Sequence, residues 1–69
     1  MEIKIKTEFI KLDSLLKFAE VVSSGGEAKV MILDEMVRLN GKITTQRGKK
    51  IRPGDIVKVE GLDEEIKVI

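Results

Sequence analysis

The apolar residues of the chain change their spacing near residue 12. Over Ile3–Thr7 they alternate with charged residues, which is typical of a strand with one solvent-exposed face. Beyond this segment the spacing becomes that of one face of a helix, and Asp13 places a negative charge in the first turn, where the helix dipole favours it. Ser23–Gly26 predicts the end of this helix, because glycine accepts the left-handed backbone of a helix C-terminus. The predicted inward stripe consists of Leu12, Leu15, Leu16, Ala19 and Val22.

A second and shorter helix is predicted directly after the first. Ser24 and Glu27 have the spacing of a capping box, in which each side chain bonds a backbone N–H group at the start of the helix. Asp34-Glu35 closes this segment, and two helices joined by so short a link form a helical hairpin or an angled pair. The predicted inward face of the second helix is Ala28, Met31 and Ile32.

Everything after Met36 has the pattern of β-structure. Asn40-Gly41 lies between the predicted strand segments Met36–Leu39 and Lys42–Thr44 and predicts a tight hairpin. Arg52–Asp55 predicts a second turn, because its proline presets φ and its glycine accepts positive φ. Residues 1–69 are therefore predicted to form one α+β domain, with two N-terminal helices packed on a small antiparallel sheet. The later strands are predicted at Ile56–Glu60 and Ile66–Ile69.

The residue inventory excludes most catalytic and metal chemistry. The chain has no Cys and no His, which removes disulfides, thiolate nucleophiles, imidazole bases and the usual zinc sites. Its serines and threonines therefore have no His to activate them, and its acidic clusters lie in predicted turns without apolar surroundings. A chain of 69 residues also has little room for a deep substrate pocket. We expect no enzymatic activity, no metal site, no cofactor and no small-molecule substrate.

The chain has no segment suited to a membrane or to export. Its longest apolar run, Val30–Leu33, is far shorter than the roughly 20 residues that span a bilayer. The N-terminus alternates apolar and charged residues and contains no signal-peptide core. These features predict a cytoplasmic protein without a membrane partner.

The net charge of +1 conceals a basic middle segment between acidic ends. Residues 1–35 carry a charge of −2, residues 36–60 carry +5 and residues 61–69 carry −2. A charged run is ordinarily solvated surface, but six cations follow Glu35 before the next acid. Because like charges repel, such a cluster is typical of a surface for an anionic partner. The six cations are Arg38, Lys42, Arg47, Lys49, Lys50 and Arg52.

Gly25-Gly26 has two interpretations. Glycines let a phosphate approach the backbone, and free N–H groups at a helix start attract anions, with Lys29 close enough to add a charge. The other interpretation is a tight turn between two helices, in which the glycines serve geometry alone. Glu27 opposes an anion at this place unless its capping interaction holds it aside.

The two aromatic residues, Phe9 and Phe18, flank the first helix and are both predicted to belong to the core. Proteins that bind single strands usually stack bases on exposed aromatic rings. Without such rings, the expected mode of nucleic-acid binding is recognition of shape and phosphates in structured RNA or in a duplex backbone.

Four motifs follow one another in a specific order along the chain. Lys11-Leu12-Asp13 and Ser24–Ala28 each open a helix, and Val37–Lys42 and Arg52–Val57 come after them. Over residues 9–61 this order resembles the S-four RNA-binding domain, which is named after a ribosomal small-subunit protein and is also called the αL motif. The chain length, the Ser-Gly-Gly element and Arg47–Lys50 are most similar to its small stand-alone YaaA-like subgroup.

The resemblance implies two packed helices on a bent antiparallel sheet and a surface for structured RNA such as ribosomal RNA. In the family this surface follows the start of the second helix and the adjoining hairpin and loop. Many members have arginines where this chain has Gly25 and Gly26, so this chain lacks the contacts that those arginine side chains make with phosphates. Carried over to matching positions, the RNA-binding residues are Lys11, Ser24, Lys29, Arg38, Lys42, Arg47, Lys49 and Lys50. The glycine and charge patterns add Gly25, Gly26 and Arg52 to the predicted RNA-binding residues.

We therefore predict a non-catalytic RNA-binding protein that recognises structured RNA, ribosomal RNA above all, in ribosome assembly or translation. The alternative is a β-grasp-like protein-interaction domain without nucleic-acid binding, since such folds share the Asn-Gly hairpin and the Pro-Gly-Asp turn. A sulfur carrier of that fold needs a C-terminal Gly-Gly, whereas this sequence ends Lys67-Val68-Ile69.

Overall fold

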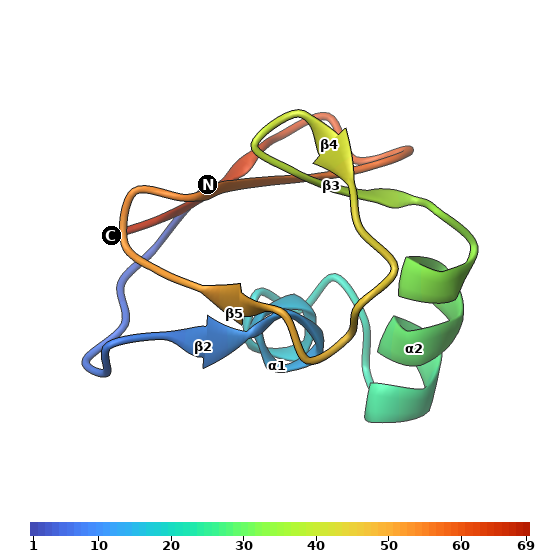
Figure 1. Cartoon of the computed structure of the whole chain (residues 1–69), viewed down its shortest axis with the longest axis horizontal. Helices are drawn as coiled ribbons and strands as arrows, with labels where there is room; N and C mark the ends of the chain where they lie inside the picture. The colour runs from blue at the N-terminus through green and yellow to red at the C-terminus, as the bar shows by residue number, and fades with distance from the viewer.

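The computed structural model describes residues 1–69 and contains two helices and seven strands (Figure 1). The helices are α1 (Leu12–Phe18) and α2 (Gly25–Leu33). Neither helix has the length and apolar character needed to cross a membrane. The strands are β1 (Glu2–Ile3), β2 (Ile10–Lys11), β3 (Val37–Leu39), β4 (Lys42–Ile43), β5 (Lys50–Ile51), β6 (Ile56–Val59) and β7 (Ile66–Val68).

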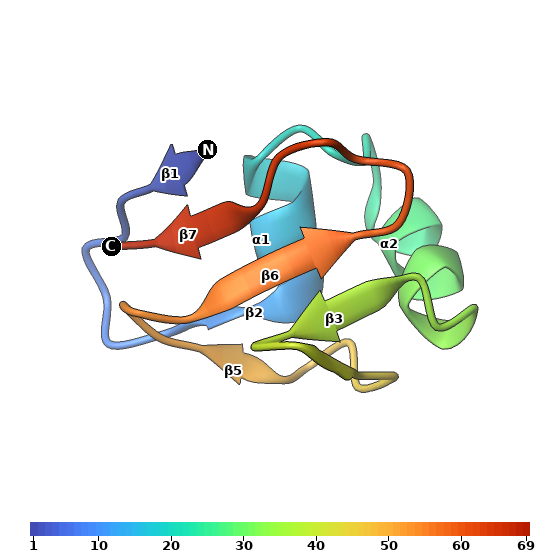
Figure 2. The ribbon, with the colours of Figure 1, turned by 90° about the horizontal axis from the view of Figure 1, so that it is seen from above.

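Five of the strands form one sheet, in the order β1-β7-β6-β3-β4. β1 runs parallel to β7, whereas the other neighbours in this sheet are antiparallel. β2 and β5 form a separate antiparallel ribbon, in which Ile10 lies opposite Ile51 and Lys11 lies opposite Lys50. The helices and this ribbon lie on the same side of the five-stranded sheet (Figure 1), and Figure 2 shows α1 passing behind its strands.

The predicted fold class, two helices on a small antiparallel sheet, is wrong. Strands predominate, and the main sheet is mixed because β1 pairs in parallel with β7. The ribbon of β2 and β5 adds a second sheet. Pairing between the first and the last strand depends on the path of the whole chain, so local periodicity carries no sign of it. Strands of two residues are also too short for an alternating pattern to be visible.

Both predicted helices are present, but α1 is shorter than its apolar stripe. It ends at Phe18, and Glu20 adopts a left-handed conformation with a φ of 59° soon afterwards. Val22 is nevertheless buried, because the link between the helices returns it to the core. Ser24 caps α2 as predicted, since its Oγ accepts a hydrogen bond from the Glu27 N–H at 3.2 Å.

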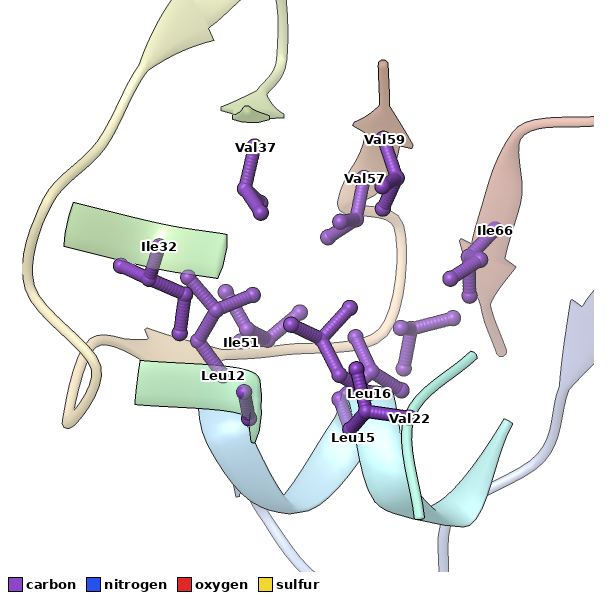
Figure 3. Close-up of a cluster of buried hydrophobic side chains, with 12 residues drawn as sticks. Leu12, Leu15, Leu16, Val22, Ile32, Val37, Ile51, Val57, Val59 and Ile66 are labelled. Atoms are coloured by element: carbon purple, nitrogen blue, oxygen red, sulfur yellow. The ribbon is translucent and has the colours of Figure 1, made fainter. Parts of the chain in front are cut away.

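The hydrophobic core lies between the helices and the inner face of the five-stranded sheet (Figure 3). β6 shows how alternation builds it, because Val57 and Val59 are buried while Lys58 between them is exposed. Burial of each leucine, isoleucine or valine contributes about 1.5–3 kcal/mol relative to exposure. The buried set is Leu12, Leu15, Leu16, Val22, Ala28, Ile32, Val37, Ile51, Val57, Val59, Ile66 and Val68.

Neither aromatic residue belongs to this core, so the prediction for both rings is wrong. Phe18 is 63% exposed, because it follows Leu16 by two residues and therefore projects from nearly the opposite side of α1. Phe9 is half-buried, but it is not among the side chains that pack against the core.

Candidate nucleic-acid interface

Two adjoining hollows open between the β3–β4 hairpin and the segment that leads into β5. Their volumes are about 480 and 520 Å³, and both are lined by Leu39, Asn40, Gln46 and Lys49. Figure 1 shows the hairpin above this region, β5 below it and the connecting segment at its side. We call this region the basic hollow, because the charged residues around it are Lys42, Lys49, Lys50 and Arg52, with Asp55 as the one carboxylate.

The Asn40-Gly41 turn shapes the basic hollow and is fastened to the turn before β6. Both turn residues have positive φ, 51° at Asn40 and 87° at Gly41, as in the tight turns that match the twist of a hairpin. Asn40 Oδ1 accepts a hydrogen bond from the Ile56 N–H at 2.9 Å, and Asn40 Nδ2 donates one to Asp55 Oδ1 at 3.0 Å. Asp55 Oδ2 accepts a third from the Arg52 N–H at 2.8 Å. One asparagine and one aspartate thus hold both turns together.

Asp55 lowers the positive charge of the basic hollow but does not cancel it, because four cations surround one carboxylate. Both carboxylate oxygens of Asp55 already accept hydrogen bonds from the turns. No lysine or arginine side chain donates any of the side-chain hydrogen bonds in the structure. All four cations of the basic hollow are exposed. Their charge therefore remains available to an anion from solution.

The ribbon of β2 and β5 extends the basic hollow toward the start of α1. Lys11 lies directly opposite Lys50 across the ribbon, a pairing of like charges that is unfavourable by itself. The backbone N–H of Leu12 donates to the Lys49 carbonyl at 2.9 Å, and that of Asp13 donates to the Arg47 carbonyl at 3.0 Å. The first turn of α1 thus holds the basic segment in place and brings Lys11 and Arg47 near the hollow.

Three of the twelve acidic residues lie together at the far side of the molecule from the basic segment. The loop between β6 and β7 carries Asp63, Glu64 and Glu65, all of them exposed. Figure 2 shows this loop at the opposite side of the molecule from β5 and the segment that precedes it. The acidic end of the sequence at residues 61–69 therefore lies apart from the basic segment, whereas Asp13 of the acidic N-terminal part adjoins it through the bond from its N–H to the Arg47 carbonyl. No group of three or more acidic side chains converges where it would hold a metal ion.

Arg38 does not join the basic hollow. It lies opposite Lys58 on the outer face of the five-stranded sheet. These two cations line a smaller hollow of about 290 Å³ together with Glu35 and Glu60. The charge on this face is therefore mixed, unlike that of the basic hollow.

The start of α2 is a separate region as well, since Ser24, Gly25, Gly26 and Lys29 line neither part of the basic hollow. Glu27 Oε1 accepts hydrogen bonds from the Ser23 N–H at 2.7 Å and the Ser23 hydroxyl at 3.1 Å. Its carboxylate therefore lies across the start of the helix, where it already occupies part of the region that an anion would approach.

The two glycines are not required by the geometry of the link. Neither Gly25 nor Gly26 has a positive φ, and a Cβ atom at Gly25 would meet nothing within 4 Å. At Gly26 the nearest atom is the Ser24 Oγ at 4.0 Å. Larger side chains would therefore fit at both positions, and the residue that turns the chain after α1 is Glu20 instead.

The sequence predicted no role at this interface for Asn40 and Asp55, whose side chains hold its two turns together. Asn-Gly and Pro-Gly-Asp both predicted turns, and both turns are present. An Asn and an Asp at such turns also offer side-chain hydrogen bonds, which is the signal that was available. Which partner each side chain finds, 15 residues away in the sequence, depends on the fold.

Replacing Asn40 with Ala is expected to lower the free energy of unfolding by about 1–3 kcal/mol. The substitution removes two side-chain hydrogen bonds and forces an alanine into a left-handed conformation. For a domain of this size, the melting temperature should fall by about 4–8 °C for each kcal/mol. Thermal unfolding followed by circular dichroism measures the change.

Gln46→Ala is the matched control. Gln46 also lines both parts of the basic hollow, but its side chain makes none of the hydrogen bonds described for the protein. Its removal should change the melting temperature little. Equal melting temperatures for the two variants would contradict the role assigned to Asn40.

Two comparisons relate the chain to known proteins. A family model described as S4 domain matches residues 3–69. A protein of Bacillus subtilis (strain 168), named probable ribosome maturation protein RlbA, is 42% identical over 59 residues, which cover 86% of this chain and 83% of that protein.

Proposed function

This chain belongs to the S4 domain family, and from that premise we propose that it is a non-catalytic RNA-binding protein. In this proposal the basic hollow receives the phosphate backbone of a structured RNA. The cations that contact phosphates are Lys11, Lys42, Arg47, Lys49, Lys50 and Arg52.

The observation that carries the proposal is the net positive charge of the basic hollow. Four exposed cations surround it against one acid, Asp55, whose carboxylate accepts hydrogen bonds from the turns and none from a cationic side chain. Lysines held close together without acidic partners repel one another, and a phosphate chain relieves that repulsion. The concave shape suits a folded RNA, whose backbone can follow the hollow, better than a flat surface would.

The relative from Bacillus subtilis supports ribosomal RNA as the target, because its name is that of a ribosome maturation protein. The role of this chain is then to bind ribosomal RNA during ribosome assembly. Arg38 and the start of α2, with Ser24, Gly25, Gly26 and Lys29, lie outside the basic hollow, so they contact only an RNA that extends beyond it.

Salt dependence tests the proposal directly. With about five phosphates neutralised by these six cations, the slope of log affinity against log salt should be about −3.5 to −4.5. Binding to a folded ribosomal RNA fragment is measured by fluorescence anisotropy from about 50 to about 200 mM salt, over which phosphate contacts of this number weaken binding strongly. Absence of binding at the lowest salt, or a slope near zero, would refute the proposal.

A further inference from the structure

The ring of Phe9 has no place in the hydrophobic core, although it is one of only two aromatic rings in the protein. The next residue, Ile10, packs against the core. Because side chains alternate along an extended backbone, Phe9 and Lys11 share the opposite side. Lys50, directly across the ribbon from Lys11, places its Nζ 4.8 Å from the centre of the Phe9 ring. Phe9 is therefore a half-exposed ring on the basic side of the molecule.

We propose that Phe9 is the stacking platform for one unpaired base of the bound RNA. The inference rests on the proposed function and adds a class of target to it, namely a structured RNA with an unpaired nucleotide at the ribbon of β2 and β5. Bases in a continuous A-form duplex are stacked on one another and offer no free face, whereas a base in a bulge or loop does.

The Lys50 side chain covers the face of the Phe9 ring on which the base would stack. In the free protein its exposed ammonium group lies over the half-buried ring, and such an attraction is weak near water. Stacking of a base on an aromatic ring is the stronger interaction. The base therefore takes the position of the ammonium group, and Lys50 turns to the phosphate of the same nucleotide. This exchange also moves the Lys50 ammonium group away from Lys11, because the two like charges lie opposite each other across the ribbon and repel.

The experiment compares two RNA stems that carry 2-aminopurine at the same position. In the bulged stem the 2-aminopurine has no partner, and in the continuous stem the opposite strand has one more nucleotide, which pairs with it. The wild-type protein should bind the bulged stem about tenfold more tightly, and binding should quench the fluorescence of the bulged base. Phe9→Leu keeps an apolar side chain without an aromatic face. This variant should lose both the preference and the quenching while still binding the continuous stem.

Two further variants separate stacking from structural support. Phe9→Tyr restores an aromatic face and should restore the preference and the quenching. Phe18→Leu removes the other exposed ring, at the far end of α1, and should leave both unchanged. Lys50→Met should weaken binding to both stems but keep the quenching, because the ring remains free for the base.

The outcomes distinguish failure of the stacking proposal from failure of the proposed RNA binding. Equal affinity of the wild-type protein for the two stems would overturn the stacking proposal and leave RNA binding intact. Absence of binding to either stem at low salt would overturn both. If Phe9→Leu weakened binding to both stems equally, or if Lys50→Met abolished the quenching, Phe9 would be a structural support rather than a stacking platform.

Discussion

Replacing both Lys42 and Lys49 with Glu is expected to weaken binding of a folded ribosomal RNA fragment about a hundredfold or more. Both side chains line the same part of the basic hollow, and both are exposed. Each contact between a lysine and a phosphate contributes about 1.5–3 kcal/mol, and the loss of two such contacts amounts to roughly 3 kcal/mol at the lower limit. The slope of log affinity against log salt should become shallower by about 2.

The melting temperature of this double variant should barely change, since neither lysine side chain makes a hydrogen bond in the free protein. The matched control is the double replacement of Lys4 and Lys6 with Glu, which changes the net charge equally at exposed positions that line no part of the hollow. Equal weakening by both double variants would mean that total charge, and not the basic hollow, governs binding.

Ile51→Ala should lower the free energy of unfolding by about 2–5 kcal/mol. Ile51 lies between Lys50 and Arg52 and is fully buried, so it anchors the basic strand β5 to the core (Figure 3). The ribbon of β2 and β5 has two residue pairs, and Ile51 belongs to one of them. A small domain has little stability to spare, and a loss of this size removes a large part of it.

Urea denaturation measures this loss, with two variants for comparison. Ile51→Val deletes a single methyl group and should cost about 0.5–1.5 kcal/mol. Ile43→Ala removes an isoleucine that is 46% exposed and should change the free energy of unfolding much less. If Ile51→Ala and Ile43→Ala destabilised the protein equally, burial of Ile51 would not be what holds the basic strand in place.

Several elements were predictable because their signals are local. The apolar stripe from Leu12, the cap formed by Ser24 and the Asn40-Gly41 turn each depend on residues within a few positions of one another. The family resemblance is confirmed by the match over residues 3–69, which favours it over the β-grasp alternative. The fold class was not predictable in this way, because the parallel pairing of β1 with β7 joins the two ends of the chain.

The candidate site shows the same division. The basic middle segment was visible as a charge imbalance, and four of its six cations do surround one hollow. Arg38 does not, because alternation along β3 turns it to the outer face of the sheet beside Lys58. Phe9 was predicted to be buried from its apolar character, yet the strand direction places its ring beside Lys50.

The order of residues alone determined the family, the two helices, the hairpin turn and the excess of positive charge after Glu35. These properties depend on composition or on neighbours along the chain, so no folding is needed to recognise them. Only the tertiary structure decided which cations face one another, how Asp55 is held between the two turns, and where the ring of Phe9 lies. Those properties depend on strand register and on contacts between distant segments, which exist only when burial of the core brings the segments together.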